Sequence, residues 1–174
     1  MKRKLYFWQF AGFVFTGIAG TLLHFVYEWT DSMFFALFSA VNESVWEHMK
    51  LLFFPMIIFA LFQSRYLRGT YHNFWFAKII GILSGLILIP MLYYTYTGAL
   101  GINADWFNIL IFFIAAGVGF LLETHILYMG NNFYLPRISA FIIFGIIAVL
   151  FIFFTFVTPK IPLFIDPVTK TYGI

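Results

Sequence analysis

Five long apolar runs dominate this chain of 174 residues and limit what it can fold into. Each run has about the 20 residues that an α-helix needs to cross the ~30 Å hydrocarbon core of a bilayer. They occupy residues 5–27, 43–64, 74–94, 106–128 and 138–157. Because 63% of the residues are hydrophobic and only 10% are charged, no stretch is left for a soluble domain. The sequence therefore predicts an all-α integral membrane helix bundle, with residues 1–174 forming a single transmembrane domain.

Basic residues at the ends of these runs predict the orientation of the chain. They fall on one side of a five-span arrangement: Lys2, Arg3, Lys4, Arg65, Arg68 and Arg137. Basic loops stay preferentially in the cytoplasm. We therefore expect a plasma-membrane protein with a cytoplasmic N-terminus and an extracytoplasmic C-terminus. The net charge of +3 reflects this role in topology, so it does not indicate nucleic-acid binding.

Two further segments belong to the predicted outer side. Residues 32–41 are too apolar for a solvated loop and, at ~1.5 Å per helical residue, too short to cross the bilayer. They predict an interfacial or re-entrant half-helix between the first two spans, after which Asn42 is expected to cap the second span. Residues 158–174 combine apolar side chains with three prolines, which favours an extended strap over the outer surface.

The residues that carry chemistry gather around residues 42–50, Asn-Glu-Ser-Val-Trp-Glu-His-Met-Lys. Three pairs of polar residues have the four-residue spacing of one helix face: His24 and Glu28, Glu43 and Glu47, and Ser44 and His48. Counting ~1.5 Å per residue places all of them in the outer third of the bilayer. Ionisable groups at such depth are costly and indicate a functional site.

This cluster predicts one ligand-binding site that faces outward. The expected metal ligands are His24, Glu28, Glu43, Glu47 and His48, with Ser44 and Asp166 as additional ligand-binding groups. Carboxylates and imidazoles from adjoining helices suit a divalent ion such as zinc, manganese or iron. The same groups also fit a proton relay. A packed polar network without a ligand, in which Glu47 pairs with Lys50, is the third interpretation.

A second polar group lies near the inner ends of the spans. Glu123 and His125 are about eighteen residues from Asp105, or ~27 Å below it in a helix. Lys78 enters the third span at a similar depth. We expect a Lys78–Glu123 ion pair, because each charge would otherwise lie unpaired in a low-dielectric environment.

Two motifs bracket most of the chain and carry a resemblance. The first is Asn42-Glu43-Ser44-Val45-Trp46-Glu47-His48, followed by Lys50 and Pro55. The second is the terminal Pro-Leu-Phe-x-Asp-Pro…Tyr-Gly pattern of residues 162–173. The sequence thus resembles a family of small bacterial multi-pass membrane proteins of unknown function. That resemblance implies a membrane location and no particular reaction.

The chain is also weakly similar to the alkaline-ceramidase group of membrane hydrolases, whose members carry a Ser-x-x-x-His pattern on one helix. Ser44 and His48 match that pattern. The histidines that the group carries on a late helix have no counterpart, because residues 138–157 contain none. The likeness therefore implies only an analogy of local chemistry.

Three hypotheses about function follow from the sequence. In the first, the outer Glu/His site captures a metal ion, a cation or a small polar solute for transport, in a monomer or a homo-oligomer. In the second, His24, His48 and one glutamate hold a metal while another glutamate activates water, giving a membrane hydrolase for a lipid or acyl substrate. In the third, the protein is a structural membrane subunit. The excess of acids over histidines favours the first.

Overall fold

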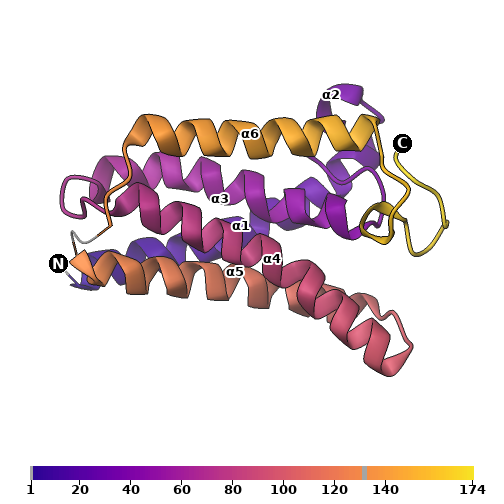
Figure 1. Cartoon of the computed structure of the whole chain (residues 1–174), viewed down its shortest axis with the longest axis horizontal. Helices are drawn as coiled ribbons and strands as arrows, with labels where there is room; N and C mark the ends of the chain where they lie inside the picture. The colour runs from indigo at the N-terminus through magenta and orange to yellow at the C-terminus, as the bar shows by residue number, and fades with distance from the viewer. Residues whose placement is uncertain (1, 131–132) are drawn as a thin grey trace.

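A computed structural model of the chain describes residues 2–130 and 133–174 as an elongated bundle of helices (Figure 1). The long helices are α1 (Lys2–Thr30), α3 (Val45–Leu67), α4 (Phe74–Leu100), α5 (Asp105–Tyr128) and α6 (Arg137–Phe156). Each is long and apolar enough to cross a membrane. The all-α fold with five spans is confirmed. The N- and C-termini lie at opposite ends of the bundle, as an odd number of spans requires (Figure 1).

The N-terminus of α3 differs from the sequence expectation. Ser44 caps this helix, because its side-chain oxygen accepts a hydrogen bond from the backbone N–H of Glu47. The prediction that Asn42 caps it is wrong: the Asn42 side chain accepts from the Ser44 N–H and donates to the Gly173 carbonyl instead. Glu43 consequently precedes the helix rather than lying in its first turn.

Small residues allow α4 and α5 to pack closely. A Cβ atom added at Gly81 would lie 2.7 Å from the carbonyl oxygen of Gly119, and one added at Gly85 would lie 3.2 Å from that of Ala115. Backbone-to-backbone approach of this kind is the usual role of small residues in membrane helices. The glycine pair of α4 is therefore used for packing within one chain.

A buried polar chain links four helices toward the end of the bundle that holds the N-terminus, which is the predicted inner end (Figure 1). The Lys78 ammonium pairs with the Glu123 carboxylate, which confirms the expected ion pair. Gln9 donates to Glu123 Oε2 at 3.3 Å, and Gln63 donates to Gln9 Oε1 at 2.7 Å. All four side chains are buried. Hydrogen bonds from both glutamines thus extend the pair, as a buried charge requires.

Two short segments lie at the opposite end of the bundle, which is the predicted outer end (Figure 1). The expected half-helix is shorter than residues 32–41, since only α2 (Met33–Ala36) is helical. The C-terminal segment contains η2, a 3₁₀ turn over Pro162–Phe164, and folds back across the start of α3 (Figure 1). Phe164 is buried there against Trp46, with ring centroids 4.8 Å apart. We call residues 158–174 the strap.

Candidate metal centre

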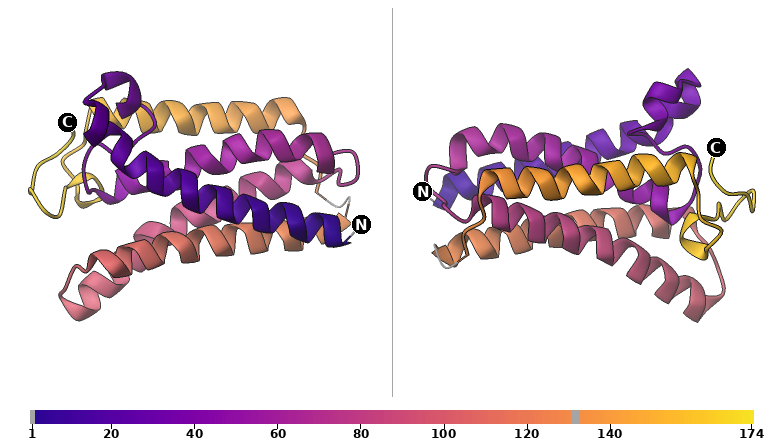
Figure 2. Two further views of the ribbon diagram at one scale, coloured as in Figure 1. Left: turned by 180° about the vertical axis from the view of Figure 1, so that it is seen from behind. Right: turned by 45° about the horizontal axis from the view of Figure 1, so that its top comes forward.

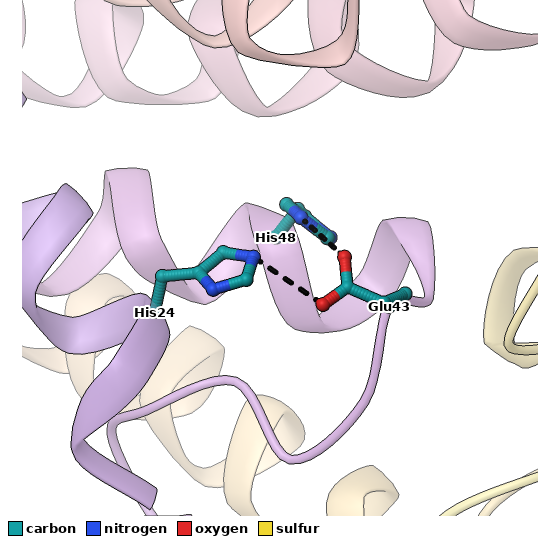
Figure 3. Close-up of side chains that lie close together, drawn as sticks. All are labelled: His24, Glu43 and His48. Carbon is teal, nitrogen blue, oxygen red and sulfur yellow. Dashed lines mark ion pairs between the residues drawn. The ribbon is translucent and has the colours of Figure 1, made fainter. Parts of the chain in front are cut away.

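Three side chains meet near the outer end of the bundle, where α1 and α3 adjoin (Figure 3). His24 Nε2 lies 3.5 Å from Glu43 Oε1, and His48 Nε2 lies 3.5 Å from Glu43 Oε2. One potential ligand atom from each residue lies within 4.8 Å of the other two. Glu43 therefore stands between the two imidazoles, with one carboxylate oxygen turned toward each.

Local structure sets the direction of each of these side chains. His24 projects from α1, whereas His48 lies in the first turn of α3 and Glu43 in the connection just before it. The Ser39 hydroxyl fixes this connection to α1, because it donates to the Leu23 carbonyl and accepts from the Tyr27 N–H at 3.0 Å. Both bonds lie within four residues of His24 and hold the connection beside it.

The tautomer of His48 follows from its backbone contact. His48 Nδ1 lies 2.9 Å from the Ser44 carbonyl oxygen, which can only accept a hydrogen bond. Nδ1 therefore carries the hydrogen, and in the neutral ring Nε2 has a free lone pair. That lone pair faces a Glu43 carboxylate oxygen, which is also an acceptor. Two acceptors at this separation repel each other, and a cation or a proton between them would remove that repulsion.

Glu43 itself is held as a carboxylate. Its hydrogen bond with His24 lowers its pKa below the ordinary value, and this outweighs the opposing effect of partial burial. Positive charge on either histidine would lower the pKa further. The side chain retains 45% exposure. Glu43 is thus a charged group at the boundary between protein and solvent.

The geometry is close to that of a tetrahedral ion site. Zinc–nitrogen and zinc–oxygen bonds of ~2.0 to 2.1 Å place neighbouring ligand atoms ~3.3 Å apart. The two His–Glu separations of 3.5 Å are within a few tenths of an ångström of that value. These two separations end on different oxygens of Glu43, and the ligand atoms of the three residues lie within 4.8 Å of one another, so side-chain rotations that shorten these distances would be needed to bring all three residues around one ion.

Glu47 does not join this cluster. It is buried and pairs with Lys50, whose Nζ lies 2.5 Å from Glu47 Oε2. The Val41 N–H and the Thr155 hydroxyl donate to its two oxygens at 3.2 and 2.9 Å. Both oxygens of the Glu47 carboxylate are thus engaged by groups within the protein. The structure places Glu47 in a packing network, as the third interpretation expected for this residue.

The other expected site residues have different positions. Glu28 is exposed and outside the group of atoms that converge on one point. The Ser44 side chain caps α3, and the Ser44 carbonyl accepts a hydrogen bond from His48 Nδ1. Neither oxygen is one of the candidate metal ligands. Asp166 accepts hydrogen bonds from the backbone of Glu43, at 3.4 Å, and of Val168. His125 is exposed on the inner half of α5, far along the chain from the cluster.

A cavity of about 480 Å³ adjoins the three residues. His24, Glu43 and His48 line one side of it, and α5 lines the other. The remaining lining residues are Gly20, Thr21, Phe25, Leu51, Asn103, Asp105, Asn108, Ile109, Phe112, Phe113, Pro167 and Val168. Most of the wall is apolar, which is typical of a site for a small organic ligand.

Sequence reasoning missed two asparagines that form the polar part of the opposite wall. Asn108 Nδ2 donates to Asn103 Oδ1 at 2.9 Å. The Tyr96 hydroxyl lies 2.5 Å from Asn108 Oδ1 and 2.9 Å from Asn103 Oδ1. Asn108 could have been identified from the sequence, because an amide side chain within an apolar span needs a hydrogen-bond partner or a ligand.

The chain belongs to the Family of unknown function (DUF6512), which matches residues 1–174. Comparisons with curated proteins and with solved structures gave no match. Family membership agrees with the resemblance seen in the sequence and supplies no reaction. The function therefore has to be inferred from the site.

Proposed function

We propose that this member of the family binds one divalent transition-metal ion through His24, Glu43 and His48, and that zinc is the ion that fits best. The observation that supports this is the convergence of two imidazoles on one carboxylate, with the His48 lone pair directed at Glu43. Two histidines and a glutamate are a common set of zinc ligands. Manganese favours more oxygen ligands and fits less well, whereas non-haem iron(II) also uses two histidines and one carboxylate and is the main competing ion.

A metal ion accounts for the arrangement better than a proton does. A proton between His48 and Glu43 joins only that pair, whereas one divalent ion attracts all three groups. The Ser44 carbonyl also serves as an outer partner of the kind that metal-binding histidines have, because it fixes the tautomer that presents Nε2. Among the described residues, His24 Nδ1 is buried without a hydrogen-bond partner, so no other protein group competes for that nitrogen.

The cavity favours hydrolysis as the use of this metal. Three protein ligands leave a coordination position open, which is the pattern of catalytic zinc sites. A zinc-bound water has a pKa near ~7 and is a strong nucleophile toward an acyl carbon. The protein then acts as a metal-dependent membrane hydrolase for a lipid or acyl substrate.

Transport is the less favoured use, because apolar packing lies directly inward of the site. A Cβ atom added at Gly20 would be 2.8 Å from the Leu51 carbonyl oxygen and 2.6 Å from the Phe112 ring. Further inward, one added at Gly12 would be 2.6 Å from Phe120 and 2.7 Å from Phe59. Such close packing between helices leaves little room for an ion to pass toward the inner end.

Metal analysis of the purified full-length protein tests the proposal. Wild type loaded with zinc and then desalted should retain one ion per chain, and Glu43→Gln should retain much less. Glu28→Gln is the matched control, since it removes an exposed acid of α1 close to the site, and it should behave as wild type. Equal zinc retention by Glu43→Gln and wild type would overturn the proposal.

The proposal also includes an orientation, in which the site faces out of the cell and the N-terminus is cytoplasmic. The basic residues at the inner end, such as Arg65 and Arg137, support it. A cysteine introduced at Thr169 in the strap should react with an impermeant thiol reagent on intact cells. A cysteine at Gly69, between α3 and α4, should react only after lysis. The reverse pattern would show the opposite orientation.

A further inference from the structure

The cavity beside the three residues has a closed inner end. At Gly17, a Cβ atom would lie 2.9 Å from the Phe113 ring, so α1 and α5 are in contact there. Gly20, Leu51 and Phe112 line the next level outward. Beyond this point the outer ends of α4 and α5 lean away from the rest of the bundle (Figures 1 and 2). The cavity thus lies on the outer side of this contact between α1 and α5.

Its side between α1 and α5 carries apolar residues that are exposed. Phe25 on α1 is 39% exposed, and Ile109 and Phe113 on α5 are 59% and 37% exposed. All three also line the cavity. In a membrane-spanning helix, such side chains contact lipid. Exposed apolar side chains of α1 and α5 therefore form the wall of the cavity on this side.

Two tryptophans indicate how deep this wall lies. Trp29 on α1 and Trp106 on α5 are 65% and 66% exposed, as expected for residues at the membrane interface. His24 is five residues inward of Trp29, or ~7.5 Å along the helix. Phe113 is seven residues inward of Trp106, or ~10 Å. The candidate metal ligands consequently lie just below the interface, at the level where head groups join acyl chains.

The two ends of the cavity differ in chemistry. The inner and lateral walls are apolar, whereas Asn103, Asp105 and Asn108 line the outer side opposite His24. Amide groups can donate to or accept from a polar head group, and the Asp105 carboxylate disfavours an anionic one. A ligand that matches this wall has an apolar chain, a carbonyl near the three metal ligands and a polar head directed outward.

We infer that the substrate is an amphiphile of the outer leaflet, an acyl ester or amide whose chain passes between α1 and α5. This inference rests on the proposed function. In the reaction, water adds to the acyl carbon and the C–O or C–N bond breaks. The proton of the water passes to the leaving oxygen or nitrogen. A carboxylic acid and an alcohol or amine result, so no other reactant is needed.

Long- and short-chain metal-binding probes test this inference in the full chain. The protein is placed in phosphatidylcholine nanodiscs and loaded with Co²⁺, whose visible absorption reports its ligands. Acetohydroxamate and dodecanohydroxamate are then titrated, because both bind metals through the same group and differ only in chain length. The variants are Ile109→Trp, which narrows the gap between α1 and α5, and Ile142→Trp on α6, a control with a similar exposure of 57%.

The comparison of variants separates chain binding from partition into lipid, because partition is common to all of them. Ile109→Trp should weaken dodecanohydroxamate binding at least about tenfold and leave acetohydroxamate binding unchanged. Ile142→Trp should change neither. Unchanged dodecanohydroxamate binding in Ile109→Trp, with the Co²⁺ absorption intact, would overturn the passage of the chain between α1 and α5 alone. A protein that shows no Co²⁺ absorption and no response to either probe would overturn the proposed function and this inference with it.

Discussion

His48 donates its Nδ1 hydrogen to the Ser44 backbone carbonyl at 2.9 Å, and its Nε2 faces Glu43 at 3.5 Å. The cap that starts α3 and the orientation of a candidate metal ligand therefore depend on one residue, Ser44. Its side chain satisfies the Glu47 N–H while its carbonyl selects the His48 tautomer. This links the local folding of the helix to the chemistry of the site.

The first prediction concerns this tautomer. In the metal-free protein at pH 8, ¹⁵N NMR of labelled histidine should show His48 protonated on Nδ1 with an unprotonated Nε2. Addition of zinc should shift the Nε2 resonance and leave the Nδ1 proton in place, because the Ser44 carbonyl still accepts it. The exposed His125 is the internal control and should not respond. A proton found on Nε2 instead would contradict the hydrogen bond on which the site depends.

The second prediction separates Glu47 from Glu43. Glu47→Gln should keep zinc binding, since the Glu47 carboxylate is directed at Lys50 and Thr155. It should lower the free energy of unfolding by about 3 to 5 kcal/mol, because Lys50 is left as an uncompensated buried charge. Denaturant titration in detergent measures the stability, and elemental analysis measures the zinc.

Two controls complete this comparison. The double variant Glu47→Gln, Lys50→Met should recover part of the lost stability, because both charges are then absent. Glu43→Gln should show the opposite behaviour, with zinc lost and stability nearly unchanged in the metal-free state, because its side chain is partly exposed. If Glu47→Gln loses zinc binding and keeps full stability, Glu47 is a metal ligand and the second prediction is wrong.

The third prediction concerns the inner ion pair. Lys78→Met should destabilise the protein by about 3 to 5 kcal/mol, because it leaves Glu123 charged and buried. The double variant Lys78→Met, Glu123→Gln should be more stable than Lys78→Met alone, and its new amide oxygen can still accept the Gln9 hydrogen bond. Zinc binding should persist in both. Equal unfolding midpoints for the single and double variants would show that the charges do not stabilise each other.

The fold was predictable because it depends on composition and length. Runs of apolar residues must form helices in lipid, where each backbone polar group needs an internal partner. The Lys78–Glu123 pair was predictable for a related reason. A charged side chain at that depth in the membrane needs a partner of opposite charge, and these two residues lie at the same depth. Gln9 and Gln63 were missed, because a single uncharged amide in an apolar run gives no indication of a partner 54 residues away along the chain.

The candidate site was harder to predict, because it depends on where one helix begins. Four-residue spacing places Glu43 and Glu47 on the same side only if both are helical. Since α3 starts at Val45, Glu43 is outside the helix and turns toward His24, while Glu47 turns toward Lys50. Ser44 and Asn42 are both good caps, and the strap decides between them by binding the Asn42 side chain through Gly173. That contact joins residues 131 positions apart in the chain.

The last prediction is that Asp166 in the strap positions Glu43. Asp166 Oδ1 accepts from the Val168 and Thr169 N–H groups at 2.7 and 3.1 Å, and Oδ2 accepts from the Glu43 N–H at 3.4 Å. Burial alone would raise the pKa of Asp166, but these backbone hydrogen bonds hold it below the ordinary value. The charged form therefore stabilises the docked strap. This contribution is present above the unfolded-state pKa of about 4 and is lost as the pH falls through the lower folded-state pKa.

Asp166→Asn should loosen the strap and release the backbone of Glu43. We expect a loss of about 1.5 to 3 kcal/mol in the stability of the metal-free protein at pH 7, the range for hydrogen bonds to a charged group. Zinc affinity, measured by competition with a chelator, should fall about tenfold because Glu43 is less well oriented. Asp31→Asn, which changes an exposed acid at the same end of the bundle, should alter neither quantity. If Asp166→Asn loses stability but binds zinc as wild type does, the strap stabilises the fold without orienting Glu43.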